Sequence, residues 1–270
     1  MKEMLQKILS VKNSKDKKHK VITILGIKIK TKRHCLQMPL EQQETENNFD
    51  KQWLLKNAME RMDANRDDFF DRTRCDFHLD RYRFACEFTE GKKVIDCASG
   101  TGYGANVIKN LGRADSVVGV EIDNAAVEYA TKNYSNDDIK FINGSILDLP
   151  FEDNTFDIFT SFETLEHIED EQKQFCEVKR VLKKGGLYIL STPNDWKTDS
   201  INPHHVRKYT YEKLKKILPE HFEIIKIYNQ NSGTPNRIEN NNQARSIYLT
   251  TDKNHNLAEC FIVVCKNNKT

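Results

Sequence analysis

The chain of 270 residues carries 42 Lys and Arg against 40 Asp and Glu, and 38% of its residues are hydrophobic. This length suits one large domain with an appendage. The net charge of +2 is unevenly distributed, because residues 1–33 hold 11 basic and 2 acidic side chains and the remainder holds 31 basic and 38 acidic ones. An acidic body disfavours a nucleic-acid partner, and we expect none.

The sequence also argues against a membrane-spanning protein, a secreted protein and a disulfide- or zinc-stabilised protein. No apolar run reaches the roughly 18 residues that a membrane-spanning helix needs, and the first 20 residues lack the apolar centre of a signal peptide. The seven cysteines are scattered, odd in number and without a C-x-x-C pair, which indicates reduced thiols and neither a disulfide framework nor a zinc site. We therefore expect a cytoplasmic protein.

The N-terminal part divides into a basic tail, residues 1–36, and a helical cap, residues 37–90. Apolar residues recur at helical spacing over residues 1–11, which leaves a short basic amphipathic helix and disorder as alternatives. Residues 12–20 are rich in lysine and predict coil. Apolar and charged residues alternate over residues 21–30, which predicts a strand.

Residues 91–270 are predicted to form an α/β domain of the Rossmann-like, doubly wound type, because short apolar segments alternate with helical ones. We expect parallel strands at residues 94–97, 117–121, 139–143, 156–161 and 187–191, and helices at residues 105–111, 125–134 and 170–182. Residues 222–228 and 260–265 add an antiparallel edge pair, which makes a mostly parallel sheet of seven strands with residues 229–257 inserted as a loop.

A glycine-rich turn follows the first strand of this domain and opens onto a helix. Glycines let the backbone approach a ligand closely, and the helix N-terminus offers amides to it. Gly100, Gly102 and Ala105 satisfy the dinucleotide pattern G-x-G-x-x-G/A, and Glu121 lies near the position of a ribose ligand. Asp96 within the strand argues against a nicotinamide enzyme, because a pyrophosphate-binding turn usually has an apolar residue there.

Five separated segments carry a more specific signal. They are Val94 to Gly104, Val118 to Asp123, Leu149 to Asp157 (the pattern LPF-x-DN-x-FD), Ser161 to Ile168, and Arg180 to Gly186, in which Lys184 replaces the proline of RVLKPGG. In this order, over residues 75–228, they resemble the class I S-adenosylmethionine-dependent methyltransferases. The resemblance implies a Rossmann-like fold, S-adenosylmethionine as cofactor and methyl transfer as the activity.

The resemblance also assigns roles to single residues. Gly100 and Gly102 should hold the methionine and ribose parts of the cofactor. Asp96 should orient the turn or reach the methionine ammonium through water, and Glu121 should bind the ribose diol. The full set of expected cofactor residues is Asp96, Ala98, Gly100, Gly102, Glu121, Ile122, Ser145, Ile146, Ser161, Arg81 and Tyr82.

Two parts of this set depart from the general pattern or have an alternative. Ser145 and Ile146 should border the adenine, but relatives often carry Asp at the position of Ser145. His78 to Tyr82 resembles an HL-x-RY stretch of a subfamily, in which Arg81 would meet the methionine carboxylate. The alternative is surface pairing for Arg81 and core filling for Tyr82.

The candidate catalytic residues follow the fourth strand. Glu163, Glu166 and His167 have i, i+3, i+4 spacing and share a face if the segment is helical. A hydroxyl is a poor nucleophile at neutral pH, so its proton must be removed by a base or with the help of a metal. We expect His167, Glu163 and His205 to be catalytic.

Three interpretations of this segment stay open. Glu166-His167 stabilises a loop, or His167 is the general base, or Glu163, Glu166, His167 and His205 hold a divalent metal such as Mg²⁺. The third interpretation follows from a Glu-x-x-Glu-His segment similar to that of the small-RNA 3′-terminal 2′-O-methyltransferases. We favour no metal at this point.

The acceptor is suggested by two further resemblances. Residues 191–194 and 202–210 resemble an STPN … NP-x-HV-x-x-YT arrangement of methyltransferases associated with bacterial surface-glycan assembly, whose loop crosses the active-site mouth and favours His205 over His204. Residues 20–30 are similar to an LGIKIK tag of polysaccharide and lipopolysaccharide biosynthesis proteins. These predict O-methylation of a sugar hydroxyl of a surface-glycan precursor, with residues 1–33 contacting an anionic inner-membrane surface.

Other functions compatible with the motifs are a metal-dependent RNA 2′-O-methyltransferase, a quinone or polyketide methyltransferase, and a non-catalytic cofactor-binding scaffold in a glycan-assembly complex.

Overall fold

The computed structural model describes residues 52–54, 56–57, 62–66, 70–194, 204–233 and 244–268 with their side chains, and residues 9–13, 19–24 and 27–32 by their backbone. The chain divides into two compact units, Met1–Phe49 and Asp50–Thr270. The second unit therefore includes the later part of the predicted helical cap. The parts of the predicted tail, cap and inserted loop that fall between these ranges lie outside the described residues.

The first unit contains a three-stranded antiparallel sheet of β1 (Leu9–Asn13), β2 (His19–Ile24) and β3 (Ile27–Lys32). The strand expected over residues 21–30 is confirmed, as the hairpin of β2 and β3. Neither alternative for residues 1–11, helix or disorder, holds at the end of that range, because residues 9–11 belong to β1 and Val11 pairs with Ile22 in the sheet. This ladder supplies hydrogen bonds that the backbone of so short a helix would largely lack. The coil expected over residues 12–20 is wrong at both ends, because residues 12–13 belong to β1 and residues 19–20 belong to β2.

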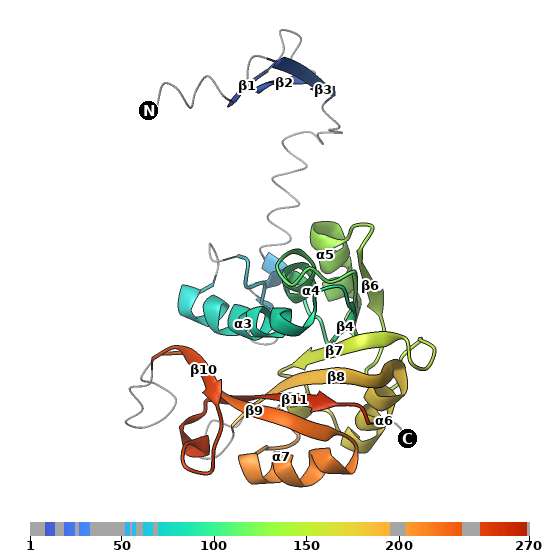
Figure 1. Cartoon of the computed structure of the whole chain (residues 1–270), viewed down its shortest axis with the longest axis vertical. Helices are drawn as coiled ribbons and strands as arrows, with labels where there is room; N and C mark the ends of the chain where they lie inside the picture. The colour runs from blue at the N-terminus through green and yellow to red at the C-terminus, as the bar shows by residue number, and fades with distance from the viewer. Residues whose placement is uncertain are drawn as a thin grey trace. The chain divides into compact units, whose positions relative to one another are not determined.

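The second unit is built on an eight-stranded sheet in the order β10-β9-β11-β8-β7-β4-β5-β6 (Figure 1). Its strands are β4 (Lys93–Cys97), β5 (Ser116–Glu121), β6 (Ile139–Asn143), β7 (Phe156–Phe162), β8 (Leu182–Pro193), β9 (Glu223–Asn231), β10 (Ser246–Leu249) and β11 (Cys260–Lys266). Strands β4 to β8 run parallel, and β11 runs antiparallel to both β8 and β9. The predicted fold class, a mostly parallel Rossmann-like sheet with an antiparallel edge region, is confirmed.

The sheet has one strand more than predicted. β10 forms inside the segment 229–257 that was expected to be a loop, and its residue Leu249 pairs with Tyr228 of β9. β9 itself continues to Asn231, beyond its predicted end. Two different features concealed these parts of the sheet: β9 ends in the polar residues Asn229–Asn231, and β10 is an apolar run of only three residues after Ser246 within an asparagine-rich segment.

Helices cover both faces of the sheet. They are α3 (Arg72–Ala85), α4 (Tyr103–Asn110), α5 (Asn124–Tyr134), α6 (Glu171–Val181) and α7 (Tyr211–Ile217), with the short 3₁₀ helices η1 (Cys86–Phe88), η2 (Leu165–His167), η3 (Leu218–Glu220) and η4 (His255–Leu257). Side chains cap several of them: Asp123 accepts hydrogen bonds from the first amides of α5, and Asp170 caps α6 in the same way. In the part of the chain that the structure describes, no helix combines the length and apolarity needed to cross a bilayer.

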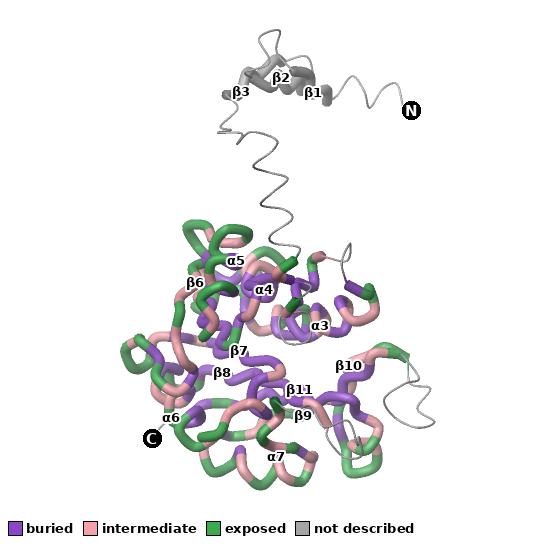
Figure 2. Tube along the Cα trace, turned by 180° about the vertical axis from the view of Figure 1, so that it is seen from behind, coloured by how far each residue is buried: buried purple, intermediate pink, exposed green. Residues whose placement is uncertain are grey.

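Two buried clusters, one on each face of the sheet, form the core. Along β11, Phe261 and Val263 belong to the cluster that α6 and α7 cover, whereas Ile262 and Val264 belong to the cluster that α3, α4 and α5 cover. This alternation is what a strand covered on both faces requires. Figure 2 shows the central strands β7, β8 and β11 as mostly buried. The carboxyl ends of the parallel strands are thereby held in fixed positions along one edge.

Candidate active site

The turn between β4 and α4 is shaped by residues in the left-handed backbone region. Ala98, Gly100 and Gly102 have φ of 60°, 54° and 84°. A Cβ at Gly102 would lie 2.7 Å from Ala130 Cβ and from the Phe141 ring, so only glycine fits there. Nothing lies within 4 Å of the corresponding position at Gly100. The turn is therefore closely packed at Gly102 and leaves room beside Gly100 for a ligand to approach the backbone.

Glu121 ends β5 and faces this turn. Its Oε2 accepts a hydrogen bond from the Gly100 amide at 3.0 Å, and its Oε1 accepts one from the Asp123 amide at 3.0 Å. The residue is 6% exposed. Since each carboxylate oxygen can accept more than one hydrogen bond, Glu121 has capacity left for a diol, and its contact with the ribose stays a prediction.

The expected adenine border lies after β5 and β6. Ile122 is 68% exposed, an unusual position for a large aliphatic side chain, and Ile146 is buried. Ser145 Oγ accepts a hydrogen bond from the Leu147 amide at 3.2 Å, so this serine closes the turn that follows β6. Their contacts with adenine stay predictions.

Asp96 lies within β4 and is buried. Thr160 Oγ1 donates to its Oδ1 at 2.8 Å, and the Tyr82 hydroxyl donates to its Oδ2 at 3.3 Å. Burial raises the pKa of Asp96 to about 7, although these two hydrogen bonds lower it, and the charge of Glu121 raises it further. The Tyr82 ring fills the space beside Gly104, so Tyr82 is a core residue that orients Asp96. Its expected contact with a cofactor stays a prediction.

Arg81, on α3, is 1% exposed, so the alternative of surface pairing is wrong. Its Nε donates to Gln230 Oε1 on β9 at 2.7 Å, and its guanidinium lies 4.6 Å from the centre of the Phe77 ring. Its Nη2 lies 3.5 Å from Glu163 Oε2 and makes no hydrogen bond to any described residue. The structure thus pairs this buried cation with a carboxylate of the candidate catalytic segment.

Glu163 is held by three distant elements. It directly follows β7 with φ of 50°. Its Oε1 accepts from Ser191 Oγ on β8 at 3.0 Å and from Cys260 Sγ on β11 at 3.1 Å, while its Oε2 faces Arg81. The thiol donates because it stays protonated: burial raises the pKa of Cys260 well above its ordinary value, and the charge of Glu163 raises it further.

Glu163, Glu166 and His167 would share a face only in a continuous helix, and the segment is not one. Only Leu165–His167 forms a single 3₁₀ turn, and the left-handed backbone at Glu163 turns the chain before it. The i, i+3, i+4 rule applies within a continuous helix and does not reach across such a turn. Glu163 is consequently directed to Arg81, whereas the other two residues lie with His205.

Glu166, His167 and His205 form a second polar cluster. Glu166 is 1% exposed; its Oε2 accepts from Thr192 Oγ1 at 3.0 Å, and its Oε1 makes no hydrogen bond to a described residue. That oxygen lies 4.0 Å from His167 Nε2, and the two imidazole rings lie 4.9 Å apart at 81°. Burial raises the pKa of Glu166 well above its ordinary value, and the charge of Glu163 raises it further.

The segment after residue 203 is fastened to this cluster through its backbone. The amides of Val206 and Arg207 donate to the Glu166 carbonyl at 2.9 and 3.2 Å. His167 Nδ1 lies 2.9 Å from the His204 carbonyl. The structure therefore brings His205 to the candidate site with its side chain and His204 with its carbonyl oxygen, as the preference for His205 predicted.

Several site residues were missed by the sequence analysis. Cys260 and Gln230 reach Glu163 and Arg81 only because β11 joins the sheet beside β8 and β9 joins it beside β11, and no local pattern marks them. Thr192 stood within the STPN pattern without a role. Thr192 directly follows Ser191, and the two hydroxyls contact different carboxylates: Thr192 donates to Glu166, and Ser191 donates to Glu163.

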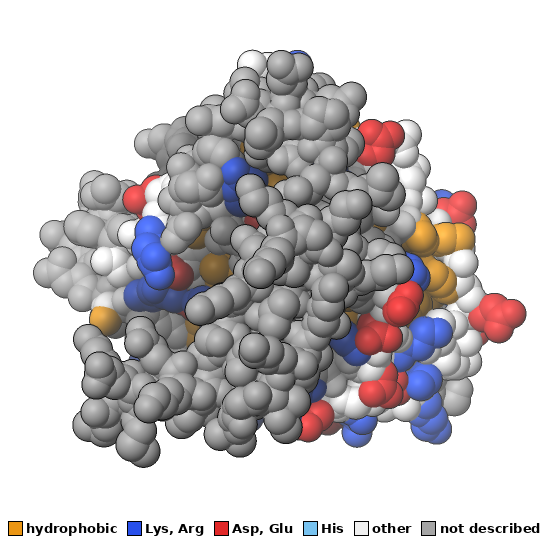
Figure 3. Space-filling model, turned by 90° about the horizontal axis from the view of Figure 1, so that it is seen from above, with side chains coloured by type: hydrophobic (Ala, Val, Ile, Leu, Met, Phe, Trp, Pro, Cys, Tyr) orange, Lys and Arg blue, Asp and Glu red, His pale blue; other side chains and the backbone are white. Residues whose placement is uncertain are grey.

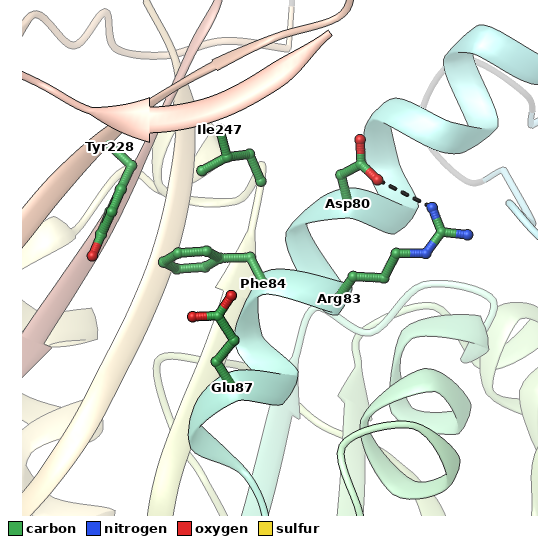
Figure 4. A pocket seen from close by; sticks show the side chains of 6 residues that line it. All are labelled: Asp80, Arg83, Phe84, Glu87, Tyr228 and Ile247. Carbon is green, nitrogen blue, oxygen red and sulfur yellow. Dashed lines mark hydrogen bonds and ion pairs between the residues drawn. The ribbon is translucent and has the colours of Figure 1, made fainter.

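A separate open hollow lies between α3 and the β9–β10 hairpin, with a volume of about 420 Å³ (Figure 4). It is lined by Asp80, Arg83, Phe84, Glu87, Tyr228 and Ile247. Arg83 Nη1 donates to Asp80 Oδ1 at 3.1 Å across its rim. None of the predicted cofactor or catalytic residues lines this hollow, so it is distinct from the candidate active site.

Comparison with known proteins relates part of the chain to methyltransferases. Residues 95–190 match the family model of a methyltransferase domain. A Mycolicibacterium smegmatis protein named "Probable S-adenosylmethionine-dependent methyltransferase" is 32% identical over 133 residues, 47% of this chain and 50% of that protein. Demethylmenaquinone methyltransferase of Staphylococcus aureus is 32% identical over 102 residues, 37% of this chain and 42% of that protein. The chain thus spans about half the length or less of these relatives.

Solved structures agree on the fold. A chain of the complex between the Haloferax volcanii Trm112 methyltransferase activator and a methyltransferase has a TM-score of 0.58 at 19% identity, covering 72% of this chain and 91% of that chain. The described sheet and helices thus have the Rossmann-like fold of these solved structures. Within it, residues 95–190 match a methyltransferase domain, and about half of the chain is similar to proteins named as S-adenosylmethionine-dependent methyltransferases.

The described residues fit the cofactor of this class, S-adenosylmethionine. The turn leaves room beside Gly100, and Glu121 offers a carboxylate beside it. Ser99 Oγ and Ser161 Oγ are buried and make no hydrogen bond to any described residue. Buried hydroxyls without a partner are uncommon, and a polar ligand at the carboxyl edge would supply one.

Proposed function

We propose that the chain transfers the methyl group of S-adenosylmethionine to a hydroxyl oxygen of a sugar in a bacterial surface-glycan precursor. The observation that carries the proposal is the cluster of Glu166, His167 and His205. Glu166 and His167 follow β7 and His205 follows β8, so the cluster lies at the same edge of the sheet as the glycine turn that follows β4. A hydroxyl acceptor needs help in losing its proton, and this cluster is chemically suited to give it.

Bound S-adenosylmethionine supplies an electrophilic methyl group, and the residues of the chain provide position and polarity. Gly100 has no side chain, so the ligand can lie against the backbone there, and Glu121 accepts hydrogen bonds from the ribose hydroxyls. The acceptor oxygen must then lie in line with the bond that breaks, so most of the rate gain comes from alignment. Glu166, His167 and His205 promote loss of the hydroxyl proton on the acceptor side.

The choice of a sugar rests on polarity and on motif resemblance. The carboxylates, hydroxyls and imidazoles around Glu163 and Glu166 match an acceptor with several hydroxyls. The segment that resembles glycan-assembly methyltransferases includes Val206 and Arg207, whose amides donate to the Glu166 carbonyl. RNA is a weaker candidate, because residues 34–270 hold 31 basic against 38 acidic side chains. On the one face drawn in Figure 3, the described acidic and basic side chains are mixed. Membrane attachment through residues 1–33 would suit a lipid-linked acceptor.

A second candidate acceptor is a quinone. It is favoured by the 32% identity to demethylmenaquinone methyltransferase, which covers 37% of this chain. The two candidates are separated by methyl transfer from radiolabelled S-adenosylmethionine to nucleotide sugars, lipid-linked glycans and demethylmenaquinone in parallel. Label in the quinone alone would contradict the sugar proposal, and cofactor binding without transfer to any acceptor would favour the scaffold alternative.

The cofactor site is tested by calorimetry with S-adenosylmethionine. Glu121→Ala is expected to weaken binding by about 10- to 100-fold, because it removes charge-assisted hydrogen bonds. Glu128→Ala removes an exposed carboxylate from α5 and serves as the matched control, with unchanged affinity. Equal affinity of wild type and Glu121→Ala would remove the assigned role of Glu121.

A further inference from the structure

We infer that Glu166, His167 and His205 form a binding site for a divalent first-row transition-metal ion. One potential ligand atom from each of these residues lies within 4.8 Å of the other two. Ions of this kind hold their nitrogen and oxygen ligands about 3.0–3.5 Å apart at bond lengths near 2.1 Å. Side-chain shifts of about an ångström would therefore complete the coordination.

Two features prepare these residues as ligands. Glu166 Oε1 is buried and makes no hydrogen bond to a described residue, while Thr192 fixes the other oxygen of the same carboxylate. His167 Nδ1 lies 2.9 Å from the His204 carbonyl oxygen, which can accept a hydrogen bond from it, and His167 Nε2 lies 4.0 Å from Glu166 Oε1. A backbone carbonyl behind a ligating histidine is a usual support of metal sites.

The ligand chemistry selects the class of metal. Two imidazoles and one carboxylate suit Zn²⁺, Co²⁺ or Fe²⁺, whereas Mg²⁺ prefers oxygen ligands. Glu163 is not in the set, because Arg81, Ser191 and Cys260 already hold its carboxylate. The site therefore differs from the four-residue Mg²⁺ interpretation of the sequence in both composition and metal.

Three protein ligands leave positions open for an acceptor oxygen. A hydroxyl coordinated there would lose its proton to water more readily, and its oxygen would be held for methyl transfer. This catalytic use rests on the proposed function, whereas the binding of the metal itself does not.

The test uses the full chain after treatment with a chelator, titrated with Co²⁺ and followed by its visible absorption. We expect about one ion per chain, at least tenfold weaker binding in His205→Ala and Glu166→Gln, and binding within about twofold of wild type in Glu163→Gln. Zn²⁺ should displace Co²⁺, and excess Mg²⁺ should not. His255→Ala, which removes an imidazole outside the cluster, is the matched control.

The outcomes separate this inference from the proposed function. Calorimetry with S-adenosylmethionine and circular dichroism report whether each variant folds. If Glu166→Gln does not fold, because Glu166 is buried, the Co²⁺ affinity of His205→Ala alone tests the metal site. Equal Co²⁺ affinity in wild type and His205→Ala, or no binding by wild type, would overturn the metal site. If the cofactor still binds and a sugar is still methylated in that case, the proposed function stands without the metal.

Discussion

Two carboxylates at the same edge of the sheet are held in contrasting ways. Glu121 accepts hydrogen bonds from two backbone amides, those of Gly100 and Asp123, which lie within 21 residues of it in the sequence. Glu163 is held by side chains of Arg81, Ser191 and Cys260, on α3, β8 and β11, as far as 97 residues away. A site made by a local turn tolerates change in distant elements, whereas a site made by converging side chains depends on all of them.

The largest expected effect is on the convergent site. Glu163→Ala should lower the free energy of unfolding by about 3 kcal/mol, because it leaves the buried Arg81 guanidinium without its carboxylate. The measurement is urea unfolding at neutral pH. Arg81→Met combined with Glu163→Gln should cost less than the single change, since no unpaired charge is then buried. A loss below about 1 kcal/mol in Glu163→Ala would show that the carboxylate is not held as described.

A smaller effect concerns Asp96, which lies between the two sites. Its folded-state pKa, raised by burial to about 7, exceeds the ordinary value of 3.8. The folded chain therefore holds the proton more tightly than the unfolded chain, and the stability due to Asp96 is full below about pH 4 and lost as the pH rises through about 7.

Wild type should consequently lose about 2–3 kcal/mol of unfolding free energy between about pH 5 and about pH 8 relative to Asp96→Asn, which cannot ionise. Urea unfolding of both proteins at the two pH values measures the difference. Parallel pH profiles would mean that Asp96 is ionised throughout in the folded chain.

The smallest effect belongs to the local site. Ala98 has φ of 60°, a conformation that costs an alanine more than a glycine. Ala98→Gly should change the unfolding free energy by less than about 1 kcal/mol, because relief of strain in the folded chain is opposed by the greater freedom of glycine in the unfolded chain. Thermal unfolding and cofactor affinity check this. A large loss of either would show that the Ala98 methyl group makes an essential contact.

The same contrast explains what the sequence could predict. The turn, Glu121 and the helix capped by Asp123 follow from residues close together in the chain, so local patterns were sufficient. β10 escaped prediction because it has only four residues and pairs with the polar end of β9, so no long apolar run marks it. The relation of Glu163 to His167 was mispredicted because one left-handed residue, Glu163, interrupts the helical spacing. Cys260 and Gln230 could not be found without the order of the strands.

That order has a consequence for how the protein is made. β11 is later in the sequence than β8 and β9, yet it lies between them and pairs with both. During synthesis the glycine turn and Glu121 can assemble as soon as β4 to β6 have emerged. Cys260 cannot reach Glu163 until β11 has left the ribosome and inserted. A nascent chain arrested before residue 260 should therefore contain the elements of the cofactor turn while its sheet still has a gap beside β8.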